Sequence, residues 1–253
     1  TVQSTNAPLP YVANRTGKWN TGGLVATDAP WQYGDVWDIP TKEWSIVQVS
    51  NSATLTSDND RILLGALVDS GSKLWMANSN ELNITSYLKL DGEIKLFNES
   101  QLLQKTESSI IDPASAGNLE RDRPGMPNLY RYNFRSSPVS LSTNIEHEYS
   151  VSDVLTGANG ETITYVGGYD GSATAGNINI AEYWIFKFAN LNDDYDLWDQ
   201  IKADGLLKPG EGFSLKGTGT TDATQNYTFK GKPNNGLMEL DLDAGNTYFV
   251  GNP

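Results

Sequence analysis

The sequence predicts an all-β protein, with a short β-solenoid in its N-terminal half and a β-sandwich or β-meander in its C-terminal half. Glycine, asparagine and aspartate (24, 23 and 19 residues) make up about a quarter of the 253 residues, and they form turns between short strands. Apolar segments recur in the first half with a period of about 21 residues, which is typical of a solenoid. Apolar and polar residues alternate in the second half, which is typical of half-buried strands.

The N-terminal stretch is rich in tryptophan, with Trp19, Trp31, Trp37 and Trp44. A stack of solenoid coils leaves apolar side chains uncovered at both ends, so such stacks need caps. We expect this aromatic stretch to cap one end of the repeats and the second half of the chain to cap the other.

The repeats lie between Ser50 and about Arg121. Ile62, Leu82 and Leu102 are evenly spaced along the chain. A second set, in which an apolar residue precedes an aspartate, recurs at nearly the same interval: Val68-Asp69, Leu90-Asp91 and Ile111-Asp112.

A single coil of this length cannot bury its own apolar side, whereas stacked coils cover one another and pair their backbones. We therefore expect Ile62, Leu82 and Leu102 to lie one above another. An ordinary antiparallel meander with coincidental spacing stays open, because periodicity does not distinguish stacked coils from hairpins.

The segment from Arg121 to Asn128 contains two prolines and a glycine, which break both helices and strands. It predicts a boundary between a domain of residues 1–123, the cap plus the solenoid, and a domain of residues 124–253. One helix is predicted in the second domain, with Asp193 or Asp194 as N-cap, Leu197 and Ile201 on one face, and Gly205 as the stop. The strands expected there are Leu129 to Phe134, Ile163 to Val166, Tyr183 to Phe188, Gly212 to Lys216, Tyr227 to Lys230 and Thr247 to Val250.

Composition excludes several classes of function. The chain has no cysteine, which removes disulfides, thiol nucleophiles and cysteine-ligated metals, and its single histidine makes a Ser–His–Asp triad improbable. The net charge of −13 disfavours nucleic acid and anionic membranes as partners. The longest apolar run, Ile62 to Val68, is too short to cross a bilayer, and the N-terminus does not resemble a signal peptide.

The sequence predicts no catalytic residue and no cofactor. Glu146-His147-Glu148 is best interpreted as a solvated loop, because in an extended chain His147 points away from both glutamates. A glycosidase needs a pair of carboxylates, and among 31 acidic residues such a pair can always be proposed. The acidic residues alone therefore do not indicate a glycosidase. Nucleophile and phosphate-binding motifs are missing.

Acidic clusters raise the possibility of a structural calcium ion, since calcium prefers hard oxygen ligands. None of the clusters matches an EF-hand loop, and solvated loops, strand faces or a helix cap are the alternative interpretation. The candidate ligands are Asp58, Asp60, Asp193, Asp194, Asp196, Asp241 and Asp243.

Aromatic clusters raise the possibility of a carbohydrate site, because flat rings stack on the apolar faces of sugars. The alternative is that such residues fill a β core or cap the solenoid. The candidate stacking residues are Trp31, Tyr33 and Trp37, and Tyr195 and Trp198.

Several motifs, taken in order, resemble one family. Tyr132 to Val139 (Y-N-F-R-S-S-P-V) is similar to a Y-N-Y-W-S-S-P-V stretch in large surface and adhesin-like proteins of gliding Bacteroidetes, with Arg135 in place of the usual Trp. The resemblance covers about residues 8–253. Its other motifs are Ala181 to Phe188, Pro209 to Phe213, Tyr227 to Gly236, Tyr87 to Gly92, Ser100 to Gln104 and Leu119 to Asp122.

The resemblance implies a location rather than a chemistry. Proteins of this family are exported by the type IX secretion system through a C-terminal sorting domain, and they are attached to the cell surface or released. No such domain is present here, and a strand expected at Tyr248 to Val250 ends shortly before Pro253, so we expect this chain to be a fragment of a longer protein.

The preferred hypothesis is therefore a non-catalytic stalk or display module of a secreted, adhesin-like surface protein, attached through machinery that reads the missing domain. The first alternative is a carbohydrate-binding module with a surface polysaccharide as partner. The second is a glycoside hydrolase, which needs a cleft with two carboxylates of different pKa.

Overall fold

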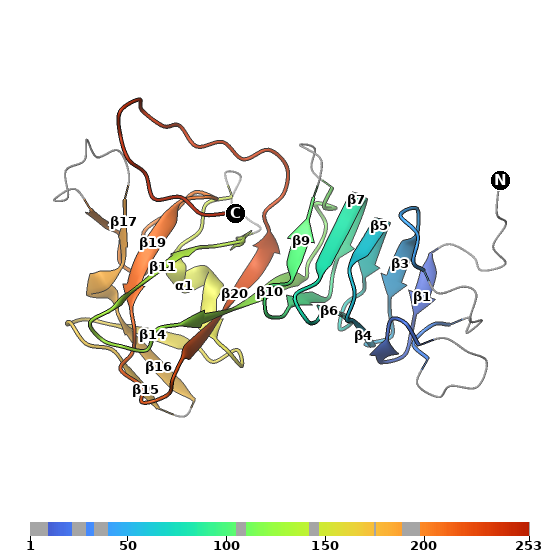
Figure 1. Ribbon diagram of the computed structural model, residues 1–253, viewed down its shortest axis with the longest axis horizontal. Coiled ribbons are helices and arrows are strands. Elements are labelled where there is room, and N and C mark those ends of the chain that lie inside the picture. The colour runs from blue at the N-terminus through green and yellow to red at the C-terminus, as the bar shows by residue number, and fades with distance from the viewer. Residues whose placement is uncertain are drawn as a thin grey trace. The chain divides into compact units, whose positions relative to one another are not determined.

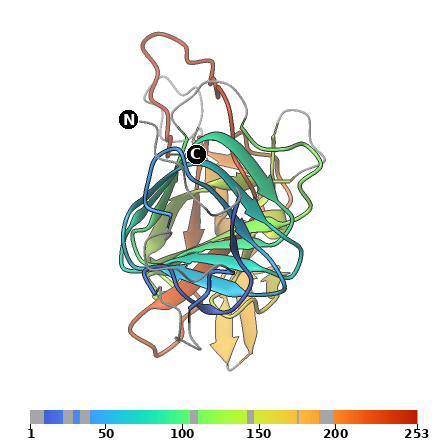
Figure 2. The ribbon, with the colours of Figure 1, turned by 90° about the vertical axis from the view of Figure 1, so that its right-hand side faces the viewer.

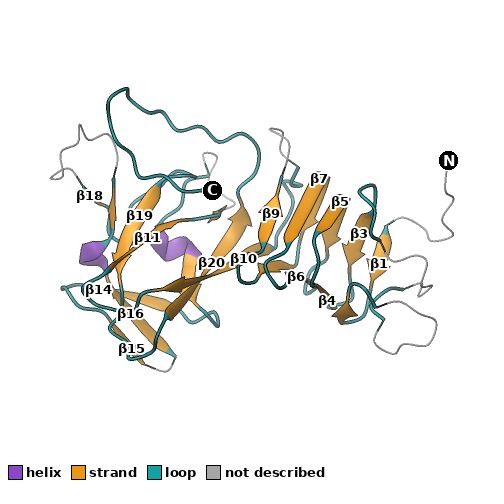
Figure 3. Cartoon of the chain, in the orientation of Figure 1, coloured by secondary structure: helices purple, strands orange, loops and turns teal. Residues whose placement is uncertain are grey.

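The structure, a computed structural model, describes residues 10–21, 29–32, 40–104, 110–141, 147–174, 176–188 and 198–252 (Figure 1). The protein is all-β, as predicted, with many strands, one short helix and one 3₁₀ turn in the described part of the chain (Figure 3). The chain divides into two compact units: unit one comprises Thr1–Glu120 and Asn235–Leu237, and unit two comprises Arg121–Asn234 and Met238–Pro253.

Unit one contains two parallel sheets, and the chain alternates between them. One sheet has the order β1-β3-β5-β7-β9, and in the other β2, β4, β6 and β8 are neighbours in that order. Figure 2 looks along this stack, with the strands of each sheet one behind another. The strands are β1 (Tyr11–Ala13), β2 (Gly17–Lys18), β3 (Ile46–Val49), β4 (Thr54–Ser57), β5 (Arg61–Val68), β6 (Lys73–Met76), β7 (Glu81–Leu90), β8 (Glu93–Leu96) and β9 (Gln101–Leu103), and β10 (Asn118–Gly125) begins in unit one and ends in unit two.

The core of unit one is made of apolar side chains that lie in register from strand to strand. Leu74 in β6 pairs with Leu55 in β4 on one side and with Ile94 in β8 on the other, and all three are fully buried. In the second sheet, Val68 is in register with Leu90, as the spacing of the apolar-Asp pairs predicts. Such columns form because neighbouring in-register strands place side chains of the same face against one another.

The predicted column of Ile62, Leu82 and Leu102 is correct for two of its three members. Leu82 pairs with Leu102, but Arg61 rather than Ile62 is in register with Leu82, and Ile62 pairs with Asn83. The interval from β5 to β7 is thus one residue longer than the even spacing of the three residues implies. Because side chains alternate between the faces of a strand, this slip leaves Ile62 on the outside, 39% exposed.

The third apolar-Asp pair is also displaced from its predicted position. Ile111 forms a bridge with Leu88, whereas the repeat of apolar-Asp pairs predicts that it lies opposite Leu90. The last interval between paired residues is therefore longer than the predicted period, so equal spacing in the sequence does not give equal intervals between strands.

The side chain of Arg61 points inward, and its guanidinium has polar and aromatic partners there. Its Nε donates to Ser57 Oγ at 2.9 Å, Nη2 donates to Asn20 Oδ1 at 2.7 Å, and the guanidinium lies 4.9 Å from the Trp19 ring. Burial lowers the pKa of this guanidinium. Trp19 is itself buried and packs edge-on against Trp31 at 5.3 Å.

The segment from Arg121 to Asn128 does not interrupt a strand as predicted, since β10 continues through Pro124 to Gly125. The division between the two units nevertheless falls after Glu120, at the start of this segment. In the sheet, β10 lies between β20 and β8, and β8 is only half as long as β10. Proline is tolerated at strand positions that need no N–H donor.

Unit two is built from several small sheets around a core that includes Phe213, Leu215, Tyr227 and Phe229. One sheet has the order β11-β19-β17-β18, a second has the order β14-β16-β15, and β20 pairs with both β12 and β13. Its elements are β11 (Tyr132–Ser136), β12 (Val139–Ser140), α1 (Val151–Val154), β13 (Leu155–Gly157), β14 (Ile163–Val166), β15 (Ser172–Thr174), β16 (Asn177–Ala181), η2 (Glu182–Trp184), β17 (Phe186–Lys187), β18 (Asp199–Gln200), β19 (Gly212–Lys216) and β20 (Gln225–Pro233).

The expected strands Ile163 to Val166 and Gly212 to Lys216 are confirmed at their predicted bounds. The expected strand at Thr247 to Val250 is wrong, since only a single bridge from Val250 to Glu211 forms there.

The predicted helix is wrong over the residues that the structure describes. Asp199–Gln200 form strand β18, paired with β17, and residues 201–205 contain no helix; Asp193, Asp194 and Leu197 lie outside the described residues. Pairing with a neighbouring strand overrides a weak local preference for helix.

Candidate functional site

The candidate site lies on the β11-β19-β17-β18 sheet of unit two, and the side-chain alternation of β19 creates it. Phe213 and Leu215 point into the core and are fully buried, so Ser214 and Lys216 face the other side. Ser214 is in register with Phe134 in β11 and with Phe186 in β17. A small residue between two large rings leaves a hollow in the face of the sheet.

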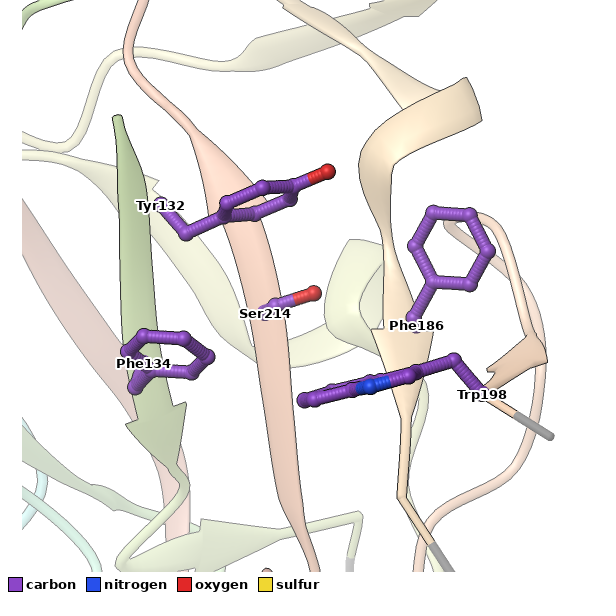
Figure 4. A pocket seen from close by; sticks show the side chains of 5 residues that line it. All are labelled: Tyr132, Phe134, Phe186, Trp198 and Ser214. Carbon is purple, nitrogen blue, oxygen red and sulfur yellow. The ribbon is translucent and has the colours of Figure 1, made fainter. Parts of the chain in front are cut away.

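This hollow is a pocket of about 220 Å³ lined by Tyr132, Phe134, Phe186, Trp198 and Ser214. Figure 4 shows the four aromatic side chains around the hydroxyl of Ser214, which lies at the floor. Ser214 Oγ donates to the carbonyl of Trp184 at 3.3 Å, and its lone pairs stay able to accept a hydrogen bond. The volume is below that of drug-sized ligand sites, so the pocket fits one small ring.

Two of the four pocket rings are exposed. Phe134 is 56% exposed and Tyr132 is 40% exposed. Apolar surface in water costs about 25 cal/mol per Å², and contiguous exposed apolar surface marks interaction sites. The rings are held in place by one another: Phe134 lies 5.5 Å from Phe249 and 6.4 Å from Trp198.

A second group of rings continues the pocket wall. Trp184 lies 6.1 Å from Tyr132 and 4.8 Å from Tyr183, and Tyr183 lies 4.8 Å from Tyr169. Trp184 Nε1 donates to the carbonyl of Tyr169 at 2.7 Å, which ties the turn η2 to the loop that precedes β15. Tyr169 is 63% exposed, so aromatic surface extends from Tyr169 to Phe134.

Lys216 brings a positive charge to this aromatic surface. Its Nζ lies 3.2 Å from the centre of the Trp184 ring and 5.1 Å from that of Tyr132. Burial lowers the pKa of the ammonium, and the charge of Asp170 partly opposes that effect. The electron-rich faces of both rings stabilise the cation.

Of the aromatic residues predicted to stack on a sugar, Trp198 lines the pocket. Trp31 instead lies in the interior of unit one at 3% exposure, where its Nε1 donates to the Trp19 carbonyl at 2.9 Å. Tyr33, Trp37 and Tyr195 lie outside the described residues.

Four residues of the pocket are not among the candidates predicted from the sequence: Tyr132, Phe134, Phe186 and Ser214. The signal available for the first two was the alternation of Tyr132, Asn133 and Phe134, which places both rings on one face of a strand. Their convergence with Phe186 depends on sheet register, which no local pattern contains.

Three of the acidic residues predicted as calcium ligands, Asp58, Asp60 and Asp243, have protein partners. Asp58 lies 3.8 Å from Lys18 Nζ, and Asp60 accepts the backbone N–H of Glu81 at 2.9 Å. Asp243 donates its backbone N–H to Tyr248 Oη at 2.8 Å, and Asp241 is exposed nearby in sequence. Asp193, Asp194 and Asp196, like Glu146 beside His147, lie outside the described ranges.

Within the described part of the chain, no three His, Asp or Glu side chains converge as a metal site would require. A calcium ion stays a prediction from the sequence. Among the same residues, no helix is long and apolar enough to cross a membrane.

Comparison with protein-family models, with curated proteins and with solved structures returned no match for this chain.

Proposed function

We propose that this chain is a non-catalytic display segment of a secreted, adhesin-like surface protein, in which unit one is a β-solenoid scaffold and unit two is a carbohydrate-binding module. The observation that carries the binding function is the pocket in which four partly exposed rings surround the hydroxyl of Ser214.

The solenoid assignment rests on the two parallel sheets and their in-register apolar columns, such as Leu55, Leu74 and Ile94. Repeated strand stacking makes a stiff spacer, because each coil contacts only its neighbours along one direction. The net charge of −13 favours solubility and opposes self-association of such a spacer.

A sugar is the ligand class that fits the pocket chemistry best. Its C–H faces pack on flat rings such as Phe134 and Trp198, and its hydroxyls need the few polar groups that Ser214 and Tyr132 supply. The pocket accepts one ring, and the exposed Tyr183 and Tyr169 offer further stacking surface for neighbouring units of a chain.

Binding rather than hydrolysis is the role that these side chains support. The described lining of the pocket contains no Asp or Glu, whereas a glycosidase places two carboxylates on either side of the bond it breaks. Surface location and export by the type IX secretion system rest on the motif resemblance alone.

Affinity electrophoresis in gels containing soluble polysaccharide tests the binding function. The panel contains three neutral polymers (xylan, laminarin and galactomannan) and two acidic ones (alginate and polygalacturonate). We expect at least one of them to retard the wild-type protein, and Phe134→Ala and Trp198→Ala to abolish the retardation.

Tyr130→Ala is the matched control, because Tyr130 is 82% exposed and does not line the pocket. Retardation of this control should equal that of the wild type. No retardation in any of the five gels, or retardation that survives both pocket variants, would overturn the proposed function.

A further inference from the structure

We propose, on the basis of the proposed glycan-binding function, that the bound polysaccharide is acidic and that Lys216 binds the carboxylate of a uronic acid unit. The position of Lys216, its lack of an acidic partner among the described residues and its aromatic surroundings each support this specificity.

Lys216 lies on the pocket face of β19, two residues from the pocket floor at Ser214. Two residues along a strand span about 7 Å, which is the scale of one sugar ring. Tyr132, in register with Lys216, both lines the pocket and lies 5.1 Å from the ammonium. A ring seated in the pocket, or the unit next to it, therefore brings a ring carboxylate within reach of Nζ.

The ammonium of Lys216 has no acceptor of its own in the described residues. No carboxylate lies within the 4.0 Å of an ion pair there, and its described neighbours are the faces of Trp184 and Tyr132. Two other lysines on strands are paired, by contrast: Lys73 lies 3.3 Å from Glu93, and Lys95 lies 3.3 Å from Glu120. An aromatic face satisfies a charge but accepts no strong hydrogen bond, so three N–H donors are left for a ligand.

The aromatic surroundings strengthen this contact. Trp184 and Tyr132 exclude water from one side of the ammonium, and a charge pair is stronger where the local dielectric is lower. The rings also hold the flexible lysine side chain over the sheet, which reduces the entropy lost on binding.

The overall charge of −13 does not oppose a local contact of this kind. Exposed charges more than about 8 Å apart are largely screened at physiological salt, so the groups next to the ligand decide the outcome. Asp170, the nearest described acid that acts on Lys216, attracts the ammonium from beyond ion-pair distance.

The test compares each acidic polymer with its own carboxyl-reduced form, which keeps the linkage and chain length and removes the charge. Titration calorimetry with alginate and with polygalacturonate oligosaccharides measures both forms against wild type, Lys216→Gln and Lys216→Arg. We expect the wild type to bind one acidic oligosaccharide on the order of tenfold more tightly than its reduced form. Lys216→Gln should remove that difference, and Lys216→Arg should retain most of it.

The other outcomes distinguish failure of the acidic specificity, of the role of Lys216 and of glycan binding itself. Equal affinity of the wild type for acidic and reduced oligosaccharides, or binding of neutral xylan, laminarin or galactomannan alone, overturns the acidic specificity and leaves the glycan-binding function standing. An acid preference that persists in Lys216→Gln overturns the role of Lys216. Binding to none of the acidic, reduced or neutral polymers overturns the glycan-binding function itself. Circular dichroism spectra of Lys216→Arg and Lys216→Gln that match the wild type show that each variant is folded.

Discussion

Truncation of Leu74 to alanine tests the stacked-coil account of unit one. Leu74 is fully buried, and it is in register with Leu55 and Ile94, so both of its neighbours are fixed by their own strands. A leucine-to-alanine change at a site that cannot collapse costs about 3–5 kcal/mol, the lost transfer free energy plus the cavity.

Urea unfolding followed by far-ultraviolet circular dichroism measures this cost. With a slope of about 1–3 kcal/mol per molar urea, the midpoint of the unit-one transition should fall by about 1 M or more. Leu64→Ala is the matched control: Leu64 lies in β5 but is 38% exposed, and its truncation should cost less than about 1 kcal/mol. Equal losses for the two leucines would refute the assignment of an inward Leu74 column.

Three further changes give distinct outcomes. Ser214→Val fills the pocket floor and removes its hydroxyl, so glycan affinity should fall on the order of tenfold, and loss of the hydrogen bond to the Trp184 carbonyl should cost about 1 kcal/mol in urea unfolding; unchanged affinity in calorimetry would contradict the floor assignment. Gly92→Ala should destabilise unit one by about 2 kcal/mol or more in urea unfolding, because a Cβ there would overlap the carbonyl oxygens of Ser72 and Asp69; a neutral effect would contradict that close approach. Burial lowers the pKa of Lys216, so affinity for an acidic oligosaccharide is full below that pKa and is lost as the pH rises through it. Calorimetry from neutral to strongly alkaline pH should find this loss at a lower pH than an exposed lysine would give, and Lys216→Arg should not show it.

The sequence predicts part of the strand register in unit one, because the apolar repeat behind it is visible along the chain. Val68 and Leu90 are in register at the spacing that the chain itself displays. The prediction for Ile62 is wrong because the interval from β5 to β7 is one residue longer than the interval from β7 to β9, which turns the Ile62 side chain to the outer face. The inward Arg61 depends on Asn20 and Trp19, which are distant from it in the sequence.

The sequence predicts that aromatic residues form a binding site in unit two, but it does not predict which of them meet in the pocket. Trp198 stands out as an aromatic candidate from composition, but its partners come from distant strands. The register that places Ser214 between Phe134 and Phe186 pairs segments that are far apart along the chain. Such register is fixed by the packing of Phe213 and Leu215 on the opposite face, which a local pattern does not encode.

The central claim is that the aromatic pocket of unit two binds a sugar chain, and the indole N–H signals of tryptophan test it most directly. Two-dimensional ¹H–¹⁵N spectra recorded during titration with oligosaccharides of each of the five polymers in the gel panel report on each tryptophan separately. The signal of Trp198 should shift and saturate with at least one of them, while that of Trp19, buried in unit one, should not move. A Trp198 signal that stays in place with all five, or one that moves together with Trp19, would contradict the claim.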